Sequence, residues 1–255
     1  SGGDFVMDGG ISSQFVSGML FSLPTAQSDS TIELIPPVES RPYIDLTTDA
    51  LRTFGIEVEE SGNSFAVKGG QRYRACNVTV EGDYSNAAFL DAFNYVDGDV
   101  TVLGLGESRQ GDRVYKELFE KLARGGCDMI DISDCPDLGP VLFALAAIYG
   151  GSFCGTRRLR IKESDRCAAM AAELAKLGAR CEIGEDTMEV CKTALRAPAE
   201  PIDSHNDHRI AMAMSILLSK VGGEIDNAGA VAKSMPDFFE KIKQLGIGVE
   251  CIEDN

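Results

Sequence analysis

The sequence predicts an α/β fold built from repeated units of two helices and short strands. Three observations indicate this class: amphipathic segments that end at a glycine recur along the chain, each continues into a short strand-like stretch, and each is preceded by a more apolar helix that opens with polar residues. Glycine suits the left-handed backbone that commonly ends a helix. Helices that alternate with strands indicate sheets covered by helices.

The amphipathic segments justify the first part of this pattern. The four segments with their strand-like continuations are 46–55 with 56–58, 115–125 with 129–130, 166–178 with 180–183, and 236–246 with 248–250. The more apolar helices are expected to open at Ser12, Asp83, Asp137 and Asn206. The glycines are unevenly spaced, which excludes a solenoid of identical short repeats.

Further strands and turns complete the units. Residues 31–35, 64–68 and 100–103 alternate polar with apolar side chains or carry β-branched ones, which predicts strands. The glycine pairs at 69–70 and 222–223 predict turns. A fresh unit begins near residue 80, so we expect residues 1–79 to hold about one unit and residues 80–255 to hold three.

Composition narrows the class of function. The chain has 255 residues, enough for one large domain or two moderate ones. Its 40 acidic and 24 basic residues give a net charge of −16, which disfavours nucleic acid or an anionic membrane as partner. No apolar run approaches the roughly 20 residues that a membrane span needs. We expect a soluble, cytoplasmic protein.

Cysteine and histidine usage indicates neither disulfides nor metal. The eight cysteines are scattered without a CxxC pair, so we expect reduced, buried thiols. The two histidines do not form a zinc-ligand pattern with them, and we predict no metal site. The chain begins at Ser1 without an initiator methionine or a secretory pattern, so we expect a piece of a longer protein.

Two charged strings are the main candidates for chemistry. Residues 162–166 read Lys-Glu-Ser-Asp-Arg and residues 206–209 read Asn-Asp-His-Arg, and each string opens an apolar helix whose unpaired N–H groups attract anions. Arginine binds carboxylate or phosphate through two N–H groups, and histidine titrates near neutral pH. Cations that hold an anion beside an acid suit proton transfer. The alternative for residues 162–166 is a solvated helix start whose charges contribute little.

Three weaker candidates lie outside the strings. Ser12 and Ser13 open a helix and could bind phosphate, although an ordinary N-cap is favoured. Asp137 opens a very apolar helix and is either a cap or a base tuned by burial. Lys233 precedes the last helix and alone is indistinguishable from a surface lysine. Residues 103–107 lack the third glycine of a dinucleotide loop, so no such site is predicted.

Taken in order, seven elements of the sequence resemble the enolpyruvyl transferase family, in particular its members that act on shikimate 3-phosphate. These elements are residues 11–15, 40–45, 80–83, 110–112, 160–166, 206–209 and Lys233. The resemblance spans the chain and implies an inside-out α/β barrel of two similar domains, each made of three βαβαββ-like units. Residues 1–79 would be the remainder of the domain that binds shikimate 3-phosphate, and residues 80–255 the C-terminal domain.

The resemblance also implies a reaction. The enolpyruvyl group of phosphoenolpyruvate would be transferred to the 5-hydroxyl of shikimate 3-phosphate by addition and elimination, with release of phosphate, in aromatic amino acid biosynthesis. It implies no cofactor and a monomer. The implied roles are Asp137 as base, Glu163 as acid, Lys162 on the hydroxyl, Arg166, Arg209 and Lys233 on phosphoenolpyruvate, Asp207 and His208 as orienting groups, Ser12, Ser13 and Ser40 on the shikimate phosphate, and Gln14 and Tyr43 along the ring.

Two departures from the family pattern leave alternatives open. The family's N-terminal Lys-Ser and Arg motif and its Gly-Thr loop have no counterpart, so we expect the chain alone to be impaired in the reaction. Arg158 stands where some members carry a substrate-contacting Asn. The alternatives are a transferase acting on UDP-N-acetylglucosamine, which residues 40–43 and 162–166 disfavour, and a non-catalytic module that binds phosphate ligands. A third, an RNA-processing enzyme on a related repeat fold, is weakened by the charge of −16.

Overall fold

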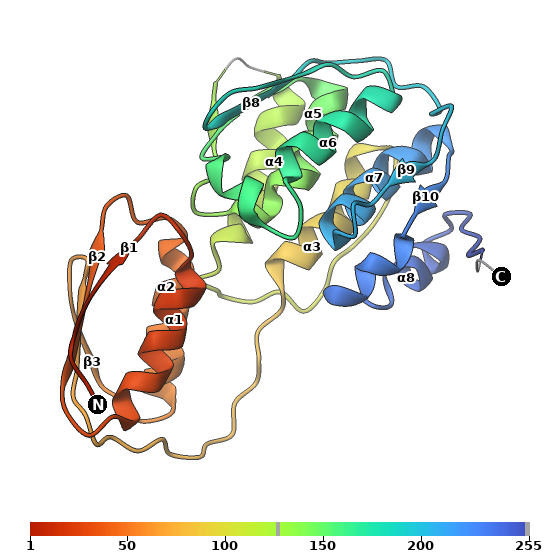
Figure 1. The fold of residues 1–255 in the computed structure, drawn as a ribbon. Coiled ribbons are helices and arrows are strands. Elements are labelled where there is room, and N and C mark those ends of the chain that lie inside the picture. Colours follow the sequence, from red (N-terminus) through yellow and green to blue (C-terminus); the bar gives the residue numbers. More distant parts are fainter. Residues whose placement is uncertain (126–127, 253–255) are drawn as a thin grey trace. The chain divides into compact units, whose positions relative to one another are not determined.

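The computed structural model describes residues 1–125 and 128–252, which group by their contacts into two units (Figure 1). Unit 1 comprises Ser1–Glu81 and Gly106–Gly111, and unit 2 comprises Gly82–Leu105 and Asp112–Asn255. The sequence predicts a boundary between residues 79 and 80 and does not reveal that residues 106–111 group with unit 1.

Unit 1 is a four-stranded sheet with two helices on one face. The chain runs through β1 (Asp4–Asp8), α1 (Ser13–Ser22), the 3-10 turn η1 (Leu23–Thr25), β2 (Ser30–Ile35), α2 (Arg41–Thr53), β3 (Val58–Ser61) and β4 (Ser64–Val67). The strand order is β1-β2-β4-β3, with β1 and β2 parallel and the remaining pairs antiparallel. Buried and exposed residues alternate along β2, so only one face of the sheet packs against the helices.

Unit 2 contains the same arrangement a second time. Its central part runs through β5 (Ile130–Asp131), the 3-10 turn η4 (Pro136–Leu138), α5 (Gly139–Tyr149), β6 (Gly151–Cys154), the 3-10 turn η5 (Arg157–Ile161), α6 (Arg166–Lys176), β7 (Cys181–Ile183) and β8 (Thr187–Val190). The strand order β5-β6-β8-β7 has the same parallel and antiparallel pairs as unit 1. The repeated βαβαββ order and its α/β class, which the sequence predicts, are confirmed.

Two further helix pairs flank this central part of unit 2. One consists of α3 (Tyr84–Asp91), followed by η2 (Ala92–Tyr95), and α4 (Tyr115–Arg124), preceded by η3 (Gly111–Val114). The other consists of α7 (His208–Val221) and α8 (Phe238–Gln244), with β9 (Ile202–Asp203), β10 (Ile225–Asp226) and η6 (Ala228–Lys233) around them. Strands β9 and β10 pair in parallel.

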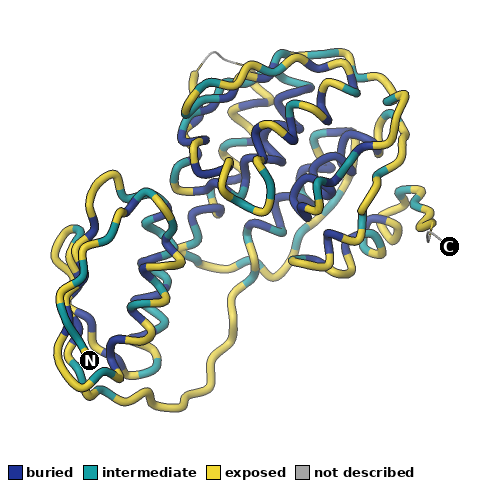
Figure 2. Tube along the Cα trace, in the orientation of Figure 1, coloured by how far each residue is buried: buried dark blue, intermediate teal, exposed yellow. Residues whose placement is uncertain are grey.

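Helices α5 and α7 form the centre of the core of unit 2 (Figure 2). Residues 139–147 of α5 and 208–218 of α7 are all buried, because these helices carry apolar or small side chains around most of their circumference. Charged residues at the start of either helix are consequently held against a well-packed, rigid support.

The helix ends agree with the sequence analysis. Gly55, Gly125, Gly178 and Gly246, the four predicted stops, have φ of +79°, +71°, +93° and +93°, a region that other residues adopt at a cost. Helix α2 begins earlier than predicted, at Arg41, because Pro42 occupies the first turn, where its missing N–H is not needed.

Several sequence predictions are wrong. Residues 100–103 and 248–250 form no strand, since neither segment pairs with any described ladder. Asp137 does not cap α5 but lies in η4, directly before Leu138, the N-cap residue of α5. Cys76 and Cys251 are exposed rather than buried, and Cys127 lies outside the described residues. In the described part of the chain no helix is long and apolar enough to cross a membrane.

Candidate functional site

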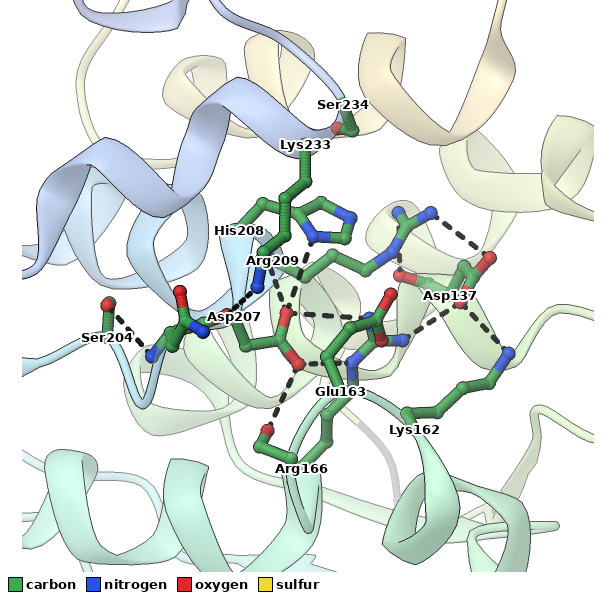
Figure 3. A network of polar contacts seen from close by, with 12 residues as sticks. Asp137, Lys162, Glu163, Arg166, Ser204, Asp207, His208, Arg209, Lys233 and Ser234 are labelled. Carbon is green, nitrogen blue, oxygen red and sulfur yellow. Dashed lines mark hydrogen bonds and ion pairs between the residues drawn. The ribbon is translucent and has the colours of Figure 1, made fainter.

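The candidate site of unit 2 lies where the segments preceding α5, α6 and α7 meet (Figure 3). Asp137 comes from η4, Lys162 to Arg166 from the turn into α6, and Asp207 to Arg209 from the start of α7. The sequence folds this way because Asp165 and Asp207 cap α6 and α7, accepting hydrogen bonds from the main-chain N of Ala168 (3.0 Å) and Arg209 (2.9 Å). The two charged strings thus converge.

Arg166 is the centre of the network. Its Nε lies 2.9 Å from Oδ2 of Asp207, its Nη1 lies 2.9 Å from Oδ1 of Asp137, and its Nη2 lies 2.6 Å from Oε2 of Glu163. The guanidinium is only 1% exposed. A buried guanidinium whose three nitrogens are directed at carboxylates holds those carboxylates in fixed positions.

Asp207 is the most deeply buried carboxylate of the site, with 0% of its side chain exposed. Ser164 donates a hydrogen bond of 3.0 Å to its Oδ2, in addition to the bonds from Arg166 and from the main chain of Arg209. Burial raises the pKa of Asp207, but Arg166 and these donors outweigh burial and hold the pKa below its ordinary value. Asp207 is therefore a fixed negative charge.

Asp137 faces three cations. Its Oδ1 lies 2.9 Å from Arg166 and 3.5 Å from Nζ of Lys162, and its Oδ2 lies 3.1 Å from Nη2 of Arg209. Burial raises the pKa of Asp137, but Arg209, Lys162 and Arg166 together lower it far below its ordinary value. One quarter of the side chain is exposed, so Asp137 can meet a ligand.

Arg209 and His208 follow Asp207 at the start of α7. Arg209 also donates to the hydroxyl of Ser85, and its guanidinium lies 6.0 Å from the ring centre of Phe89. The ring of His208 is buried, and its Nδ1 has no hydrogen-bond partner among the described residues. Burial, followed by the charge of Arg209, lowers the pKa of His208, so the imidazole is neutral at neutral pH.

Glu163 and Lys233 are the accessible members of the cluster. The carboxylate of Glu163 is 40% exposed and forms an ion pair with Arg166. Lys233 ends η6, is exposed, and donates from Nζ to the main-chain carbonyl of Asn206 (Figure 3). The side chains that face one another in this cluster are four cations and three carboxylates: Lys162, Arg166, Arg209 and Lys233 against Asp137, Glu163 and Asp207. The cluster therefore has an excess positive charge, opposite in sign to the net charge of the whole chain.

Some residues that shape the site were not singled out by the sequence analysis. In α3, Ser85 contacts Arg209 and Asn86 contacts Ser234. In α6, Glu173 forms hydrogen bonds with the ring of His205 (2.9 Å) and with the main-chain N of Asp203 (3.0 Å), both in the segment that precedes α7. Their partners are 30 or more positions away along the chain. The one sequence signal for Ser85 and Asn86 is their position at the start of a predicted helix.

Five of the predicted site residues lie in unit 1. The hydroxyl of Ser12 accepts a hydrogen bond of 3.3 Å from the main-chain N of Gln14, as in an ordinary N-cap, and Ser13 is buried in the first turn of α1. Ser40 has a φ of +54°, and its main-chain carbonyl accepts a hydrogen bond of 3.1 Å from the main-chain N of Tyr43 at the start of α2. Within unit 1 these residues thus cluster at two helix starts.

The arrangement in unit 2 suits proton transfer beside an anion. It offers carboxylates in two environments, one exposed and one held by cations, together with an ammonium and a guanidinium that can neutralise phosphate or carboxylate. Among the described residues, no group of three or more His, Cys, Asp or Glu side chains is placed to hold a metal ion.

Comparisons with known proteins agree on one family. The family model "EPSP synthase (3-phosphoshikimate 1-carboxyvinyltransferase)" matches residues 1–242. The 3-phosphoshikimate 1-carboxyvinyltransferase of Clostridium acetobutylicum is 40% identical to the chain, with 96% of this chain and 61% of that protein covered. The enzyme of Clostridioides difficile is 38% identical, with 95% and 60% covered.

Solved structures give the same result for the fold. An EPSP synthase from Acinetobacter baumannii matches with a TM-score of 0.75 and 26% identity, over 98% of this chain and 64% of that one. The enolpyruvyl transferase NikO from Streptomyces tendae matches with a TM-score of 0.64 and 16% identity, over 97% of this chain and 65% of that one, which shows a shared fold. The chain spans about 61% of the length of the first curated relatives it matches.

Proposed function

The chain belongs to the EPSP synthase family, and we propose that it carries the phosphoenolpyruvate-handling site of a 3-phosphoshikimate 1-carboxyvinyltransferase. The reaction transfers the enolpyruvyl group of phosphoenolpyruvate to the 5-hydroxyl of shikimate 3-phosphate and releases phosphate. The observation that carries the proposal is the cluster around Arg166, which holds Asp137 and Glu163 as two separate carboxylates beside Arg209. Family membership favours this transferase over the one acting on UDP-N-acetylglucosamine.

In the addition step, the 5-hydroxyl oxygen bonds to C2 of phosphoenolpyruvate. Asp137 accepts the hydroxyl proton, with Lys162 beside it, while Glu163 gives a proton to the methylene carbon, which becomes a methyl group. Elimination then breaks the bond from C2 to the phosphate oxygen, and the phosphate leaves with the proton held by Asp137. The methyl group returns a proton to Glu163, and the double bond is restored. Cations stabilise the intermediate because they are fixed before the reaction begins.

The three carboxylate partners of Arg166 indicate how it can bind a ligand. All three of its nitrogens are directed at carboxylates, and Glu163 is the most exposed of these partners. We infer that an anionic group of phosphoenolpyruvate displaces Glu163 from Arg166, which frees the Glu163 carboxyl for proton transfer. Arg209 and Lys233 provide the other cations that bind phosphoenolpyruvate. Asp207 and His208, at the start of α7, orient the cluster.

Anion binding also changes Asp137. Arg209, Lys162 and Arg166 hold its pKa far below the ordinary value, which makes it a weak base. A ligand anion that pairs with Arg209 offsets part of this stabilisation of the carboxylate, and the basicity of Asp137 rises when it is needed.

We assign the second substrate to unit 1. Ser12, Ser13 and Ser40 would bind the phosphate of shikimate 3-phosphate at the starts of α1 and α2, where free N–H groups favour anions. Gln14 and Tyr43 would line the ring. On this basis residues 1–79 are the remainder of the shikimate 3-phosphate-binding domain and residues 80–255 are the C-terminal domain. The family resemblance further implies a cytoplasmic monomer without a cofactor.

Phosphate release from the two substrates by the 255-residue chain tests the proposal. We expect impaired release that still needs both substrates and that Glu163→Gln nearly abolishes, while Glu182→Gln, a change of an exposed glutamate in β7, leaves the rate unchanged. Release that survives Glu163→Gln would overturn the assignment of the acid.

The partial span favours one second candidate, a module that binds phosphate ligands without turnover. The chain covers 61% of its first curated relative, so part of the relatives' substrate-binding machinery can be missing from it. Calorimetry separates the two functions: saturable binding of phosphoenolpyruvate without phosphate release identifies the module, and release excludes it.

A further inference from the structure

The first turn of α3 holds the segment that carries Lys233. The side-chain Oδ1 of Asn86 accepts a hydrogen bond of 2.9 Å from the hydroxyl of Ser234, and its Nδ2 lies 3.3 Å from the main-chain carbonyl of Ser234. Asn86 is itself fixed by Asp83, which accepts from its main-chain N (2.9 Å) and from Nδ2 (3.0 Å). One amide therefore binds both the side chain and the main chain of Ser234.

This contact restricts Lys233, the residue immediately before Ser234. On the other side, Nζ of Lys233 donates to the carbonyl of Asn206, the residue before the buried Asp207. The main chain of Lys233 is thus fixed by α3, and its ammonium is directed at the turn into α7 (Figure 3). A lysine has a long, flexible side chain, so a fixed main chain reduces the entropy lost when the ammonium binds a ligand.

The same helix turn also contacts Arg209. Its guanidinium donates to the hydroxyl of Ser85, which is buried, and packs over the ring of Phe89 one turn further along α3. Two of the cations in the cluster are therefore held by one turn of a helix that lies more than 100 residues earlier in the chain.

We propose that Asn86 is a positioning residue for phosphoenolpyruvate binding, acting through Ser234 to place Lys233. The proposal rests on the proposed function and adds a residue that makes no contact with the ligand. If Asn86 only stabilises the segment around Ser234, its loss lowers the stability of the fold and leaves the affinity for phosphoenolpyruvate unchanged. If it positions Lys233, its loss weakens the binding of phosphoenolpyruvate through Lys233 alone.

Asn94 provides a matched control in the same unit. Its Nδ2 donates to Asp91 (2.8 Å), three residues earlier as for Asn86, and to the main-chain carbonyl of Val100 (2.8 Å), while its Oδ1 accepts from the main-chain N of Val100 (2.6 Å). Asn94→Ala removes an equivalent set of bonds between a helical segment and a loop, at a position that contacts none of the cluster.

Amide hydrogen exchange tests the structural half of the proposal without any ligand. The main-chain N–H groups of Ser234 and Met235 donate to the carbonyl of Val231 and report on this segment. We expect Asn86→Ala to speed their exchange about tenfold, the effect of losing roughly 1.4 kcal/mol of local protection, and Asn94→Ala to leave it unchanged. Unchanged exchange in Asn86→Ala would overturn the proposal.

Calorimetric titration of the chain with phosphoenolpyruvate tests the functional half. We expect Asn86→Ala to weaken binding about fivefold to tenfold and Asn94→Ala to leave it unchanged. In a Lys233→Ala background, Asn86→Ala should have no further effect, because its target is gone. An equal loss in both backgrounds would overturn the proposal. If the unaltered chain does not bind phosphoenolpyruvate, the proposed function of this chain fails, and the exchange result alone decides whether Asn86 fixes Lys233.

Discussion

Replacing Arg166 with methionine removes the cation that three carboxylates share while keeping most of the buried volume. Removing one partner of a buried ion pair costs about 3–5 kcal/mol, because the remaining charge stays buried without compensation. Asp207 is fully buried and dominates this cost, whereas Asp137 retains Lys162 and Arg209. With a urea m-value of about 2 kcal/mol/M, the unfolding midpoint of unit 2 should fall by roughly 1.5–2.5 M.

The pH dependence of this loss identifies its cause. In the unaltered chain the pKa of Asp207 lies below its ordinary value, so its ionised form stabilises the fold above the unfolded-state pKa of about 3.9. That stability is lost as the pH falls through the lower, folded-state value. In Arg166→Met, burial acts without the opposing cation and raises the pKa of Asp207. The deficit relative to the unaltered chain should therefore be largest at neutral pH and shrink toward pH 4.

Urea unfolding followed by circular dichroism measures these effects with two further variants. Arg166→Met combined with Asp207→Asn should recover at least half of the loss, because asparagine keeps the cap of α7 without a charge. Arg124→Met removes an exposed ion pair with Glu120 and should cost less than about 1 kcal/mol. A loss in Arg166→Met no larger than in Arg124→Met, or no recovery in the double variant, would show that Arg166 does not compensate the buried charge of Asp207.

Three other predictions concern single positions. Burial lowers the pKa of His208, so below about pH 6.5 the unfolded state binds more protons than the folded state, and stability falls as the pH drops from 7 to 5. The urea midpoint of His208→Gln should therefore change less with pH over this range than that of the unaltered chain. An equal change in both proteins would contradict the buried neutral ring. Gly178→Ala should lower stability by about 1–2 kcal/mol because φ is +93°, whereas Gly18→Ala, in open space within α1, should raise it by up to about 1 kcal/mol; equal thermal shifts would argue against the left-handed stop. Glu173→Ala should cost about 2–3 kcal/mol in urea unfolding, because it removes the ion pair with Lys176, the contact with His205 and a main-chain hydrogen bond. Glu173→Gln should cost less, because it still accepts from the main chain; the reverse order would contradict the contacts.

Local chemistry explains which features of the fold the sequence predicts. A stopping glycine, a capping serine and an apolar helix each depend on a stretch of about ten residues, and Gly178, Ser12 and α7 accordingly occur as expected. Residues 100–103 look equally strand-like, but a strand exists only where a neighbour offers hydrogen bonds. The partner of a strand is a property of the whole chain, which a local pattern does not contain.

The same limit applies to the candidate site. The sequence indicates that residues 162–166 and 206–209 carry the charges and begin helices, and the structure adds that Arg166 is shared by Asp207 and Asp137 at distances of 2.9 Å. Asn86 belongs to an ordinary helix opening, and nothing in that opening reveals a partner 148 residues away. Contacts of this length depend on packing, so residues that position a site are harder to find than residues that react.

The most direct measurement is a crystal structure of the 255-residue chain grown with phosphoenolpyruvate. We expect the ligand's anionic groups on Arg166, Arg209 and Lys233, with Glu163 displaced from Arg166 and directed at the methylene carbon. A ligand bound elsewhere, or one bound there while Glu163 remains paired with Arg166, would contradict it.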